Sequence, residues 1–200
     1  MKTLIVVDVQ EDFMPGGPLA ARKGREVVPA INALMDEFDY IVATQDWHPP
    51  DHGSFAVNHP GRKPGEVIKL GGLDQLLWPP HCVQGSPGAE FAEGLRKDRF
   101  DEVFKKGSDP GIDSYSGFYD NGHVRSTGLT EHLRSKGIDE VSLCGVATDY
   151  CVKFTTLDAL RDGFKAHLHV DACRGVEANP GDIEAAIQEV REAGAIIERG

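Results

Sequence analysis

Residues 139–170 read DEVSLCGVATDYCVKFTTLDALRDGFKAHLHV. Short apolar runs at 139–144 and 165–170 predict two buried strands, and the segment between them, 150–162, has the apolar spacing of a helix that Gly163 ends. A strand, a helix and a strand in this order form a βαβ unit, whose two strands lie parallel in one sheet. The stretch therefore predicts an α/β fold.

The same alternation continues on both sides of this unit. Apolar runs and helical spacing predict, in chain order, strand 3–7, helix 26–38, strand 40–44, strand 102–104, helix 128–136, helix 183–193 and edge strand 195–197. Strands separated by helices predict a three-layer α/β/α architecture with a mostly parallel sheet, and we expect residues 1–200 to form a single domain. From about 45 to 95 the rhythm gives way to Pro-, Gly- and His-rich sequence, and a loop region of this length is usually functional.

The composition excludes several classes of protein. The chain has 200 residues, 40% of them hydrophobic, with 32 acidic against 21 basic side chains and a net charge of −11. This acidity disfavours nucleic acid, whose binding begins with a basic surface, and no apolar run reaches the roughly 18 residues that span a bilayer. The four cysteines match neither a disulfide framework nor a zinc ribbon. We therefore expect reduced thiols and a cytoplasmic protein without nucleic-acid or membrane partners.

Three strand ends carry reactive side chains. The first predicted strand runs into Asp8, the strand at 102–104 into Lys105 and Lys106, and the strand at 139–144 into a turn that leads to Cys151. Ligands of an open α/β sheet bind at the carboxyl ends of its strands, so an acid, a lysine and a cysteine can meet there. A lysine favours the thiolate, a carboxylate can move the thiol proton, and backbone N–H groups of the turn can hold an oxyanion. The pattern indicates nucleophilic catalysis, although a single cysteine in an apolar helix is more often a packing residue.

A second group of polar side chains follows the second strand. Asp46 and His48 stand two positions apart, which places both on one side of an extended segment, and His52 and His81 follow in the loop region. Two or three histidines with one carboxylate are typical of a catalytic transition-metal site with open positions for water. We therefore expect one divalent ion, Zn²⁺ in the first place, with Fe²⁺ or Mn²⁺ as alternatives.

Six motifs point to a known family. They read VVDVQEDFMPGG, ATQDWHPPDHGSF, WPPHCVQGSPGAEF, VFKKG, SYSGF and GVATDYCV. Over about residues 4–170 they resemble the nicotinamidases, a family of isochorismatase-like cysteine hydrolases. The resemblance implies the isochorismatase-like hydrolase fold and a metal-dependent cysteine amidase. Its implied reaction is hydrolysis of nicotinamide, and of pyrazinamide-like analogues, to the acid and ammonia through a thioester, with a place in NAD salvage.

The resemblance also implies catalytic residues. The lysine of the family precedes a glycine, which selects Lys106 over Lys105, and strand alternation allows only one of the two to face the site. The implied oxyanion hole consists of the N–H groups of Ala147 and Cys151, after a cis bond between Val146 and Ala147. The implied catalytic triad is Asp8, Lys106 and Cys151.

Binding residues follow from the same resemblance. The implied metal ligands are Asp46, His48 and His81, and His52 is either a further ligand or bonded to a metal-bound water. The implied ring pocket consists of Phe13, Trp78, Tyr115 and Tyr150. A homo-oligomer is expected by analogy with the family. Two alternatives stay open: another isochorismatase-like amidase acting on a ureido or carbamoyl substrate, and a non-catalytic binding module of the same fold.

Overall fold

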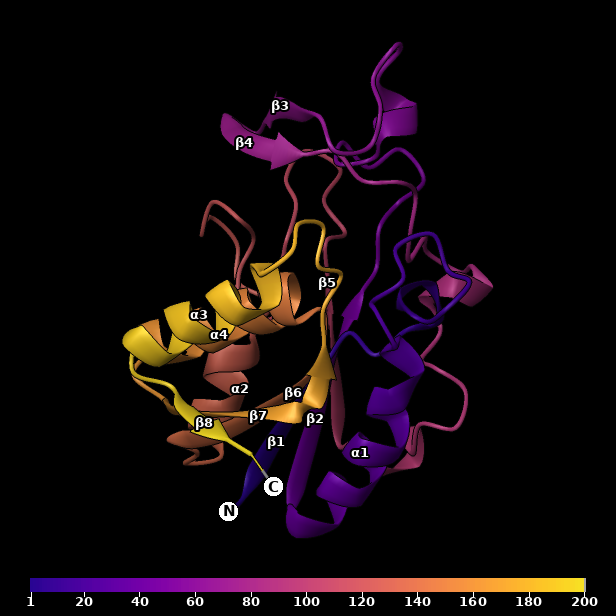
Figure 1. Ribbon diagram of the computed structural model, residues 1–200. Coiled ribbons are helices and arrows are strands. Elements are labelled where there is room, and N and C mark those ends of the chain that lie inside the picture. Colours follow the sequence, from indigo (N-terminus) through magenta and orange to yellow (C-terminus); the bar gives the residue numbers. More distant parts are fainter. Residues whose placement is uncertain (200) are drawn as a thin grey trace.

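The computed structural model describes residues 1–199, and its centre is a six-stranded parallel sheet (Figure 1). The strands of this sheet are β1 (Thr3–Val7), β2 (Tyr40–Asp46), β5 (Glu102–Lys106), β6 (Glu140–Val146), β7 (Lys165–Arg174) and β8 (Ile196–Glu198). The helices are α1 (Val27–Leu34), α2 (Leu129–Ser135), α3 (Lys153–Arg161) and α4 (Asp182–Glu192). The chain therefore has the alternation of strands and helices that the sequence predicted.

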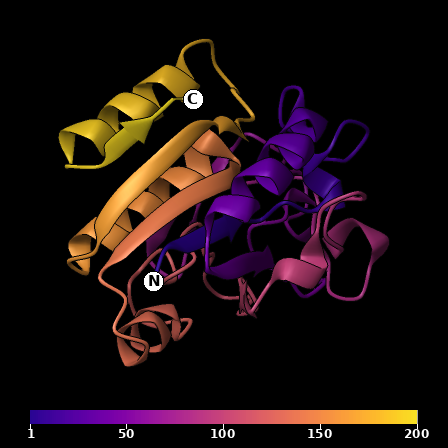
Figure 2. The same cartoon turned by 90° about the horizontal axis from the view of Figure 1, so that it is seen from below.

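The order of the strands is β5-β2-β1-β6-β7-β8. Helix α1 lies on one side of the sheet and α2, α3 and α4 on the other, as right-handed crossovers require when the direction of winding reverses at β1 (Figure 1). Seen from below, α4 and β8 (yellow) lie along one margin of the molecule, away from α1 (Figure 2). The result is the predicted three-layer α/β/α arrangement, with the reversal at β1 placing a crevice at the carboxyl ends of the strands.

Four strands, β2, β5, β6 and β7, are longer than their apolar runs predicted, and two of these extensions matter for the polar residues at the strand ends. Strand β2 continues through Gln45 and Asp46, and β5 continues through Lys105 and Lys106. The parallel ladder pairs Gln45 with Lys105 and Asp46 with Lys106, so backbone hydrogen bonds carry both strands into polar sequence. This extension brings Asp46 and Lys106 to the same end of the sheet.

Two predicted helices are not uniform α-helices. The segment predicted at 26–38 is α-helical only in α1, between 3₁₀ turns at Gly24–Glu26 and Met35–Glu37. The segment predicted at 150–162 begins as a π-helical turn, Thr148–Val152, before α3. Single π turns within helices are frequent at functional sites, and this one carries Cys151.

The loop region predicted at about 45–95 contains a β-hairpin that the sequence analysis did not identify. Strands β3 (Val67–Leu70) and β4 (Leu73–Leu76) pair antiparallel around two glycines. The hairpin stands beyond the carboxyl ends of the sheet strands (Figure 1). Its strands have four residues each and are largely exposed, so they lack the buried, alternating pattern that identifies a strand in sequence.

The core packs against both faces of the sheet, and β1 is fully buried. At Gly145 the backbones of β6 and β1 come too close for any side chain, because a Cβ there would lie 2.2 Å from Val7 O and φ is +128°. Glycine at this position lets β6 pass directly against β1 just before the turn that bears Cys151. Among residues 1–199, the helices are all too short or too polar to cross a membrane.

Candidate active site

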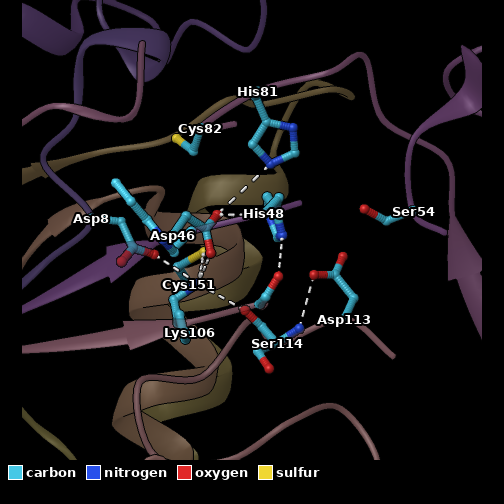
Figure 3. A network of polar contacts seen from close by, with 12 residues as sticks. Asp8, Asp46, His48, Ser54, His81, Cys82, Lys106, Asp113, Ser114 and Cys151 are labelled. Carbon is cyan, nitrogen blue, oxygen red and sulfur yellow. Dashed lines mark hydrogen bonds and ion pairs between the residues drawn. The ribbon is translucent and has the colours of Figure 1, made fainter. Parts of the chain in front are cut away.

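Lys106 lies at the centre of a group of charged side chains (Figure 3). Its side chain is fully buried, and Nζ lies 2.9 Å from Asp8 Oδ2 and 2.5 Å from Asp46 Oδ1. Nζ also lies 3.5 Å from Cys151 Sγ and donates to Ser114 O at 2.8 Å. The three reactive side chains that the sequence placed at strand ends are therefore in mutual contact through one ammonium group.

Lys105, the neighbouring lysine, faces the other way. Its Nζ lies 3.7 Å from the centre of the Trp47 ring, and its side chain is exposed to solvent. Alternation along β5 thus separates the two lysines, as expected for neighbours on a strand.

Asp8 lies directly after β1, in contact with Lys106 and close to Cys151. Its backbone has φ of +48° directly after β1, a conformation that non-glycine residues seldom adopt. Thr44 Oγ1–H donates to Oδ1 at 2.6 Å, whereas Oδ2 contacts Lys106 and has no further hydrogen-bond partner among the described residues. One carboxylate oxygen of Asp8, one of Asp46 and Cys151 Sγ lie within 4.8 Å of one another.

Burial dominates the protonation states of these groups. It raises the pKa of the Cys151 thiol well above its usual value, against the opposing effect of Lys106. It also raises the pKa of Asp8, although Lys106 acts in the other direction. Burial alone would lower the pKa of Lys106, but Asp46 and Asp8 raise it well above the usual value. The resting site therefore holds a neutral thiol, a charged ammonium and a carboxylate with increased affinity for a proton.

Asp46, His48 and His81 form one buried cluster. The Nε2 atoms of His48 and His81 lie 3.4 and 3.7 Å from Asp46 Oδ2. The other ring nitrogens are bonded to carbonyl groups at 2.8 Å, His48 Nδ1 to Gly107 O and His81 Nδ1 to Pro79 O. Since a carbonyl only accepts, each Nδ1 carries a proton, and each Nε2 faces the carboxylate and would be the atom that binds a metal ion. One carboxylate oxygen and two ring nitrogens that face one another fit a divalent transition-metal ion.

Two neighbours hold this cluster in place. A Cβ at Gly107 would lie 2.4 Å from His48 Cε1, and φ is +67°, so only glycine leaves room for the imidazole. Gln10 Oε1 accepts from Asp46 N–H at 2.8 Å, and Gln10 Nε2 donates to Asp46 O at 2.8 Å. Gln10 belongs to the quoted VVDVQEDF motif, but the sequence alone gave no sign of its contact with Asp46.

His52 lies beside His48 rather than within the cluster, with ring centres 4.3 Å apart. Ser54 N–H donates to His52 Nδ1 at 3.2 Å, so Nδ1 is an acceptor and the proton of the neutral ring is on Nε2. Nε2 is buried and has no hydrogen-bond partner among the described residues. Burial, reinforced by His48, lowers the pKa of His52 to about 4, which keeps the ring neutral. Of the two expected roles, this geometry favours donation to a water over direct ligation.

Asp113 is a buried carboxylate that the sequence analysis missed. One of its oxygens lies within 4.8 Å of ring nitrogens of His48 and His52. Oδ1 accepts from Ser114 N–H at 2.8 Å and Oδ2 from Gln75 Nε2–H at 3.1 Å. The only sequence signal was its position directly before the SYSGF motif, in a segment without strand or helix spacing.

Aromatic side chains line a small cavity that reaches Cys151. The Trp78 and Tyr150 rings meet edge to face with centres 4.9 Å apart, and Trp78 Nε1–H donates to Tyr115 OH at 3.2 Å. Phe13 lies on the same cavity and packs against His81 at 5.7 Å. The four aromatic residues expected around a substrate ring thus share one cavity. Its lining also includes Leu19 and Val176, which the sequence analysis did not name.

The turn before Cys151 also lines the cavity, through Ala147. The Val146–Ala147 peptide bond is cis, as the resemblance implied. Ala147 and Cys151 therefore lie side by side at the end of the cavity, while the oxyanion hole assigned to them stays a prediction.

The strands of this parallel α/β sheet bring a lysine and a carboxylate to a buried cysteine. This arrangement is typical of the cysteine hydrolases. The chain belongs to the isochorismatase family, since the Isochorismatase domain matches residues 2–199. It is 46% identical over 200 residues to the nicotinamidase of Escherichia coli (strain K12), covering 98% of this chain and 93% of that protein.

Solved structures agree with this assignment. The structure of Acinetobacter baumanii nicotinamidase/pyrazinamidase matches with a TM-score of 0.95 and 44% identity, covering 99% of this chain and 95% of that one. The pyrazinamidase of Pyrococcus horikoshii in complex with zinc matches with a TM-score of 0.81 and 39% identity, covering 100% and 99%. The fold is therefore that of the isochorismatase-like hydrolases.

Proposed function

We propose that this chain is a metal-dependent cysteine amidase that hydrolyses nicotinamide, and pyrazinamide-like analogues, to the acid and ammonia. One observation carries the proposal: Lys106 Nζ contacts Asp8, Asp46 and Cys151 together, so a thiol with its base and a metal-ligand cluster meet beside one cavity. The cavity beside Cys151 is lined by aromatic rings, which suit a flat aromatic substrate. Nicotinamide is proposed as the substrate because the chain is similar to relatives named nicotinamidase.

In the first half of the reaction, Cys151 is the nucleophile and Asp8 its base. Asp8 accepts the thiol proton, the sulfur attacks the amide carbon, and the N–H groups of Ala147 and Cys151 donate to the oxyanion. Asp8 then gives the proton to the departing nitrogen as the C–N bond breaks. Ammonia leaves, and the acyl group remains on the sulfur as a thioester.

In the second half, a water molecule loses a proton to Asp8 as its oxygen attacks the thioester carbon. The C–S bond breaks, the sulfur recovers the proton from Asp8, and nicotinic acid leaves and ionises to nicotinate by losing its proton to water. Lys106 stays charged throughout and stabilises negative charge as it moves between Asp8 and the sulfur. The raised pKa of Asp8 suits a group that accepts and returns protons in both halves.

Binding groups complete the proposed site. Asp46, His48 and His81 would hold one divalent ion, Zn²⁺ in the first place, with Fe²⁺ or Mn²⁺ as alternatives. When bound, such an ion supplies a Lewis-acid contact for a ring nitrogen or a water molecule. His52 Nε2 would donate a hydrogen bond to a water molecule beside these ligands. The rings of Phe13, Trp78, Tyr115 and Tyr150 enclose the substrate ring.

The cellular setting is part of the proposal. The four cysteines are free thiols, which fits a reducing compartment such as the cytoplasm. A single domain over residues 1–200 and a homo-oligomer stay predictions. Size-exclusion chromatography with light scattering measures the second of these directly.

Ammonia release from nicotinamide, measured with and without a chelator, tests the proposed activity. We expect release by the purified chain, loss of most of it after chelation, and recovery with Zn²⁺. The variant Cys151→Ala should lower kcat at least about a thousandfold while still binding metal. Cys144→Ala is the matched control, because Cys144 is a buried thiol of β6 outside the cavity and should be dispensable for turnover.

The same assay separates the alternatives. Release of ammonia from ureido or carbamoyl compounds, but not from nicotinamide, would identify another amidase of the family. No release from any amide, with metal bound and Cys151 intact, would identify a non-catalytic module.

A further inference from the structure

The buried carboxylates around the cavity outnumber the buried ammonium group that pairs with them. Asp8, Asp46 and Asp113 are at most 3% exposed, and within residues 1–199 Lys106 is the only lysine or arginine that pairs with any of them. With the thiol neutral, and the imidazoles neutral as ligation of a metal ion requires, three ionised carboxylates and one ammonium leave a formal charge of −2. Buried charge of this kind requires a compensating partner, and one divalent cation at Asp46 neutralises the group.

Asp113 is the carboxylate in this group whose charge is not compensated by a direct ion pair. Its two hydrogen bonds come from Ser114 N–H and Gln75 Nε2–H, both neutral donors. Asp8 and Asp46, by contrast, each contact the Lys106 ammonium. A third carboxylate with neutral partners is therefore expected to interact with a cation bound at Asp46.

A second observation points to the same place. His52 is completely buried, and its protonated Nε2 has no hydrogen-bond partner among residues 1–199. A ring nitrogen of His52, a ring nitrogen of His48 and an oxygen of Asp113 lie within 4.8 Å of one another. The unpaired donor His52 Nε2 and the Asp113 carboxylate thus belong to one group of buried side chains beside His48, a residue of the Asp46 cluster. A water molecule there would accept from His52 and donate to Asp113.

We propose that Asp113 is the outer carboxylate of the metal site, where with His52 it holds a water ligand of the ion and its charge completes the neutralisation of a divalent cation. Asp113 is a positioning residue in this role, since it acts on the ion through the water and through the field of its charge. The inference rests on the proposed function only in placing a metal ion at Asp46, His48 and His81.

Zinc affinity is the direct test, measured on metal-free protein by competition with a chromophoric chelator. Asp113→Asn and Asp113→Ala are each expected to raise the Kd for Zn²⁺ at least about tenfold, the range seen when outer partners of metal ligands are removed. The zinc-induced rise in Tm should shrink in parallel. Wild-type zinc affinity in either variant would overturn the proposal.

Two control variants separate charge from packing. Gln75→Leu removes the hydrogen bond to Asp113 Oδ2 but leaves the charge, and its zinc affinity should stay within about threefold of wild type. Asp109→Asn removes a carboxylate from the same segment that pairs with Arg125 near the surface, and it should leave zinc binding unchanged. An equal loss of zinc in Gln75→Leu would show that packing, not charge, is responsible, and would contradict the proposal.

Two further outcomes are decisive. If both Asp113 variants fail to fold while Gln75→Leu folds, the residue is structural and the proposal is wrong. The titration contains no nicotinamide, so its result is independent of the amidase assay. Normal zinc binding by Asp113 variants of an active amidase would refute this inference alone, and zinc-loaded protein without amidase activity would refute only the proposed function.

Discussion

Lys106 Nζ lies 2.5 Å from Asp46 Oδ1, so the ammonium beside the reactive thiol is bonded to a residue of the metal-ligand cluster. The other oxygen of Asp46, Oδ2, faces His48 and His81. Burial would raise the pKa of Asp46, but Lys106 and His48 together hold it well below the usual value. Asp46 is therefore ionised at neutral pH and links the two halves of the site.

Replacing Lys106 tests this link. Lys106→Met leaves two buried carboxylates without their cation, which we expect to cost about 3–5 kcal/mol of the free energy of unfolding. The same change should lower kcat at least about a hundredfold, because the charge that stabilises the thiolate is lost. Urea denaturation and ammonia release measure the two effects. Lys105→Met, one residue away over Trp47, should change either quantity little, and equal effects of both variants would contradict the assignment of Lys106.

Gly107→Ala tests the packing of His48. The added Cβ would meet His48 Cε1 at 2.4 Å, so the ring must move and metal affinity should fall at least about tenfold. Metal content after dialysis, measured by atomic emission, reports the loss. Gly128→Ala is the control, since its φ of +91° imposes a similar backbone cost with nothing within 4 Å of the new Cβ. That control should lose about 1–2 kcal/mol of stability but keep its metal.

The acid limb of the pH–rate profile should respond to Thr44. Asp8 must be ionised to act as a base, and the hydrogen bond from Thr44 lowers its pKa. Thr44→Val removes that bond, so the fall of kcat/KM on the acid side should move to higher pH by on the order of one unit. An unmoved limb, in a variant that folds and binds metal, would show that another group controls it.

Asp8 and Asp46 should affect folding stability with opposite signs. The raised pKa of Asp8 means that the folded state favours the protonated carboxyl, so this contribution is present at low pH and is lost as pH rises through the raised pKa. The lowered pKa of Asp46 contributes stability above its ordinary value of 3.8, which is lost as pH falls. Metal-free Asp46→Asn should therefore lose less stability than wild type between pH 5 and 3, measured by thermal unfolding.

The two tryptophans allow a matched test of the pocket. Trp78→Leu removes a ring from the cavity wall and the donor to Tyr115, so KM for nicotinamide should rise about tenfold with a smaller change in kcat. Trp47→Leu changes the ring beneath Lys105, outside the cavity, and should leave KM unchanged. A fall in kcat without a change in KM for Trp78→Leu would contradict a role in binding the ring.

The sequence could predict those strands, helices and site residues that are marked by a pattern among neighbouring residues. Buried strands such as 3–7 show as apolar runs, and alternation separates Lys105 from Lys106. The quoted motifs identify Asp46, His48 and His81 before any contact between them is known. Each of these inferences needs only neighbours in the chain, or a pattern of known spacing.

The missed groups depend on contacts between distant segments. Asp113 lies in a segment without periodicity and bonds Gln75, which is 38 positions earlier in the chain. Thr44 and Gln10 are ordinary polar residues until β1 and β2 pair and bring them to Asp8 and Asp46. The hairpin formed by β3 and β4 is exposed and short, so burial left no pattern in its sequence.

The exposed fraction of Cys151 is 6%, and burial keeps its sulfur in the thiol form. Peroxides and alkylating agents react with thiolates that solvent can reach, so the resting protein is expected to resist both. Asparagine and glutamine side chains of other proteins are also amides, but a folded chain cannot enter a hollow of this size. Burial of the sulfur is thus expected to protect Cys151 from oxidation and alkylation, and to keep the amide side chains of other proteins from reaching it.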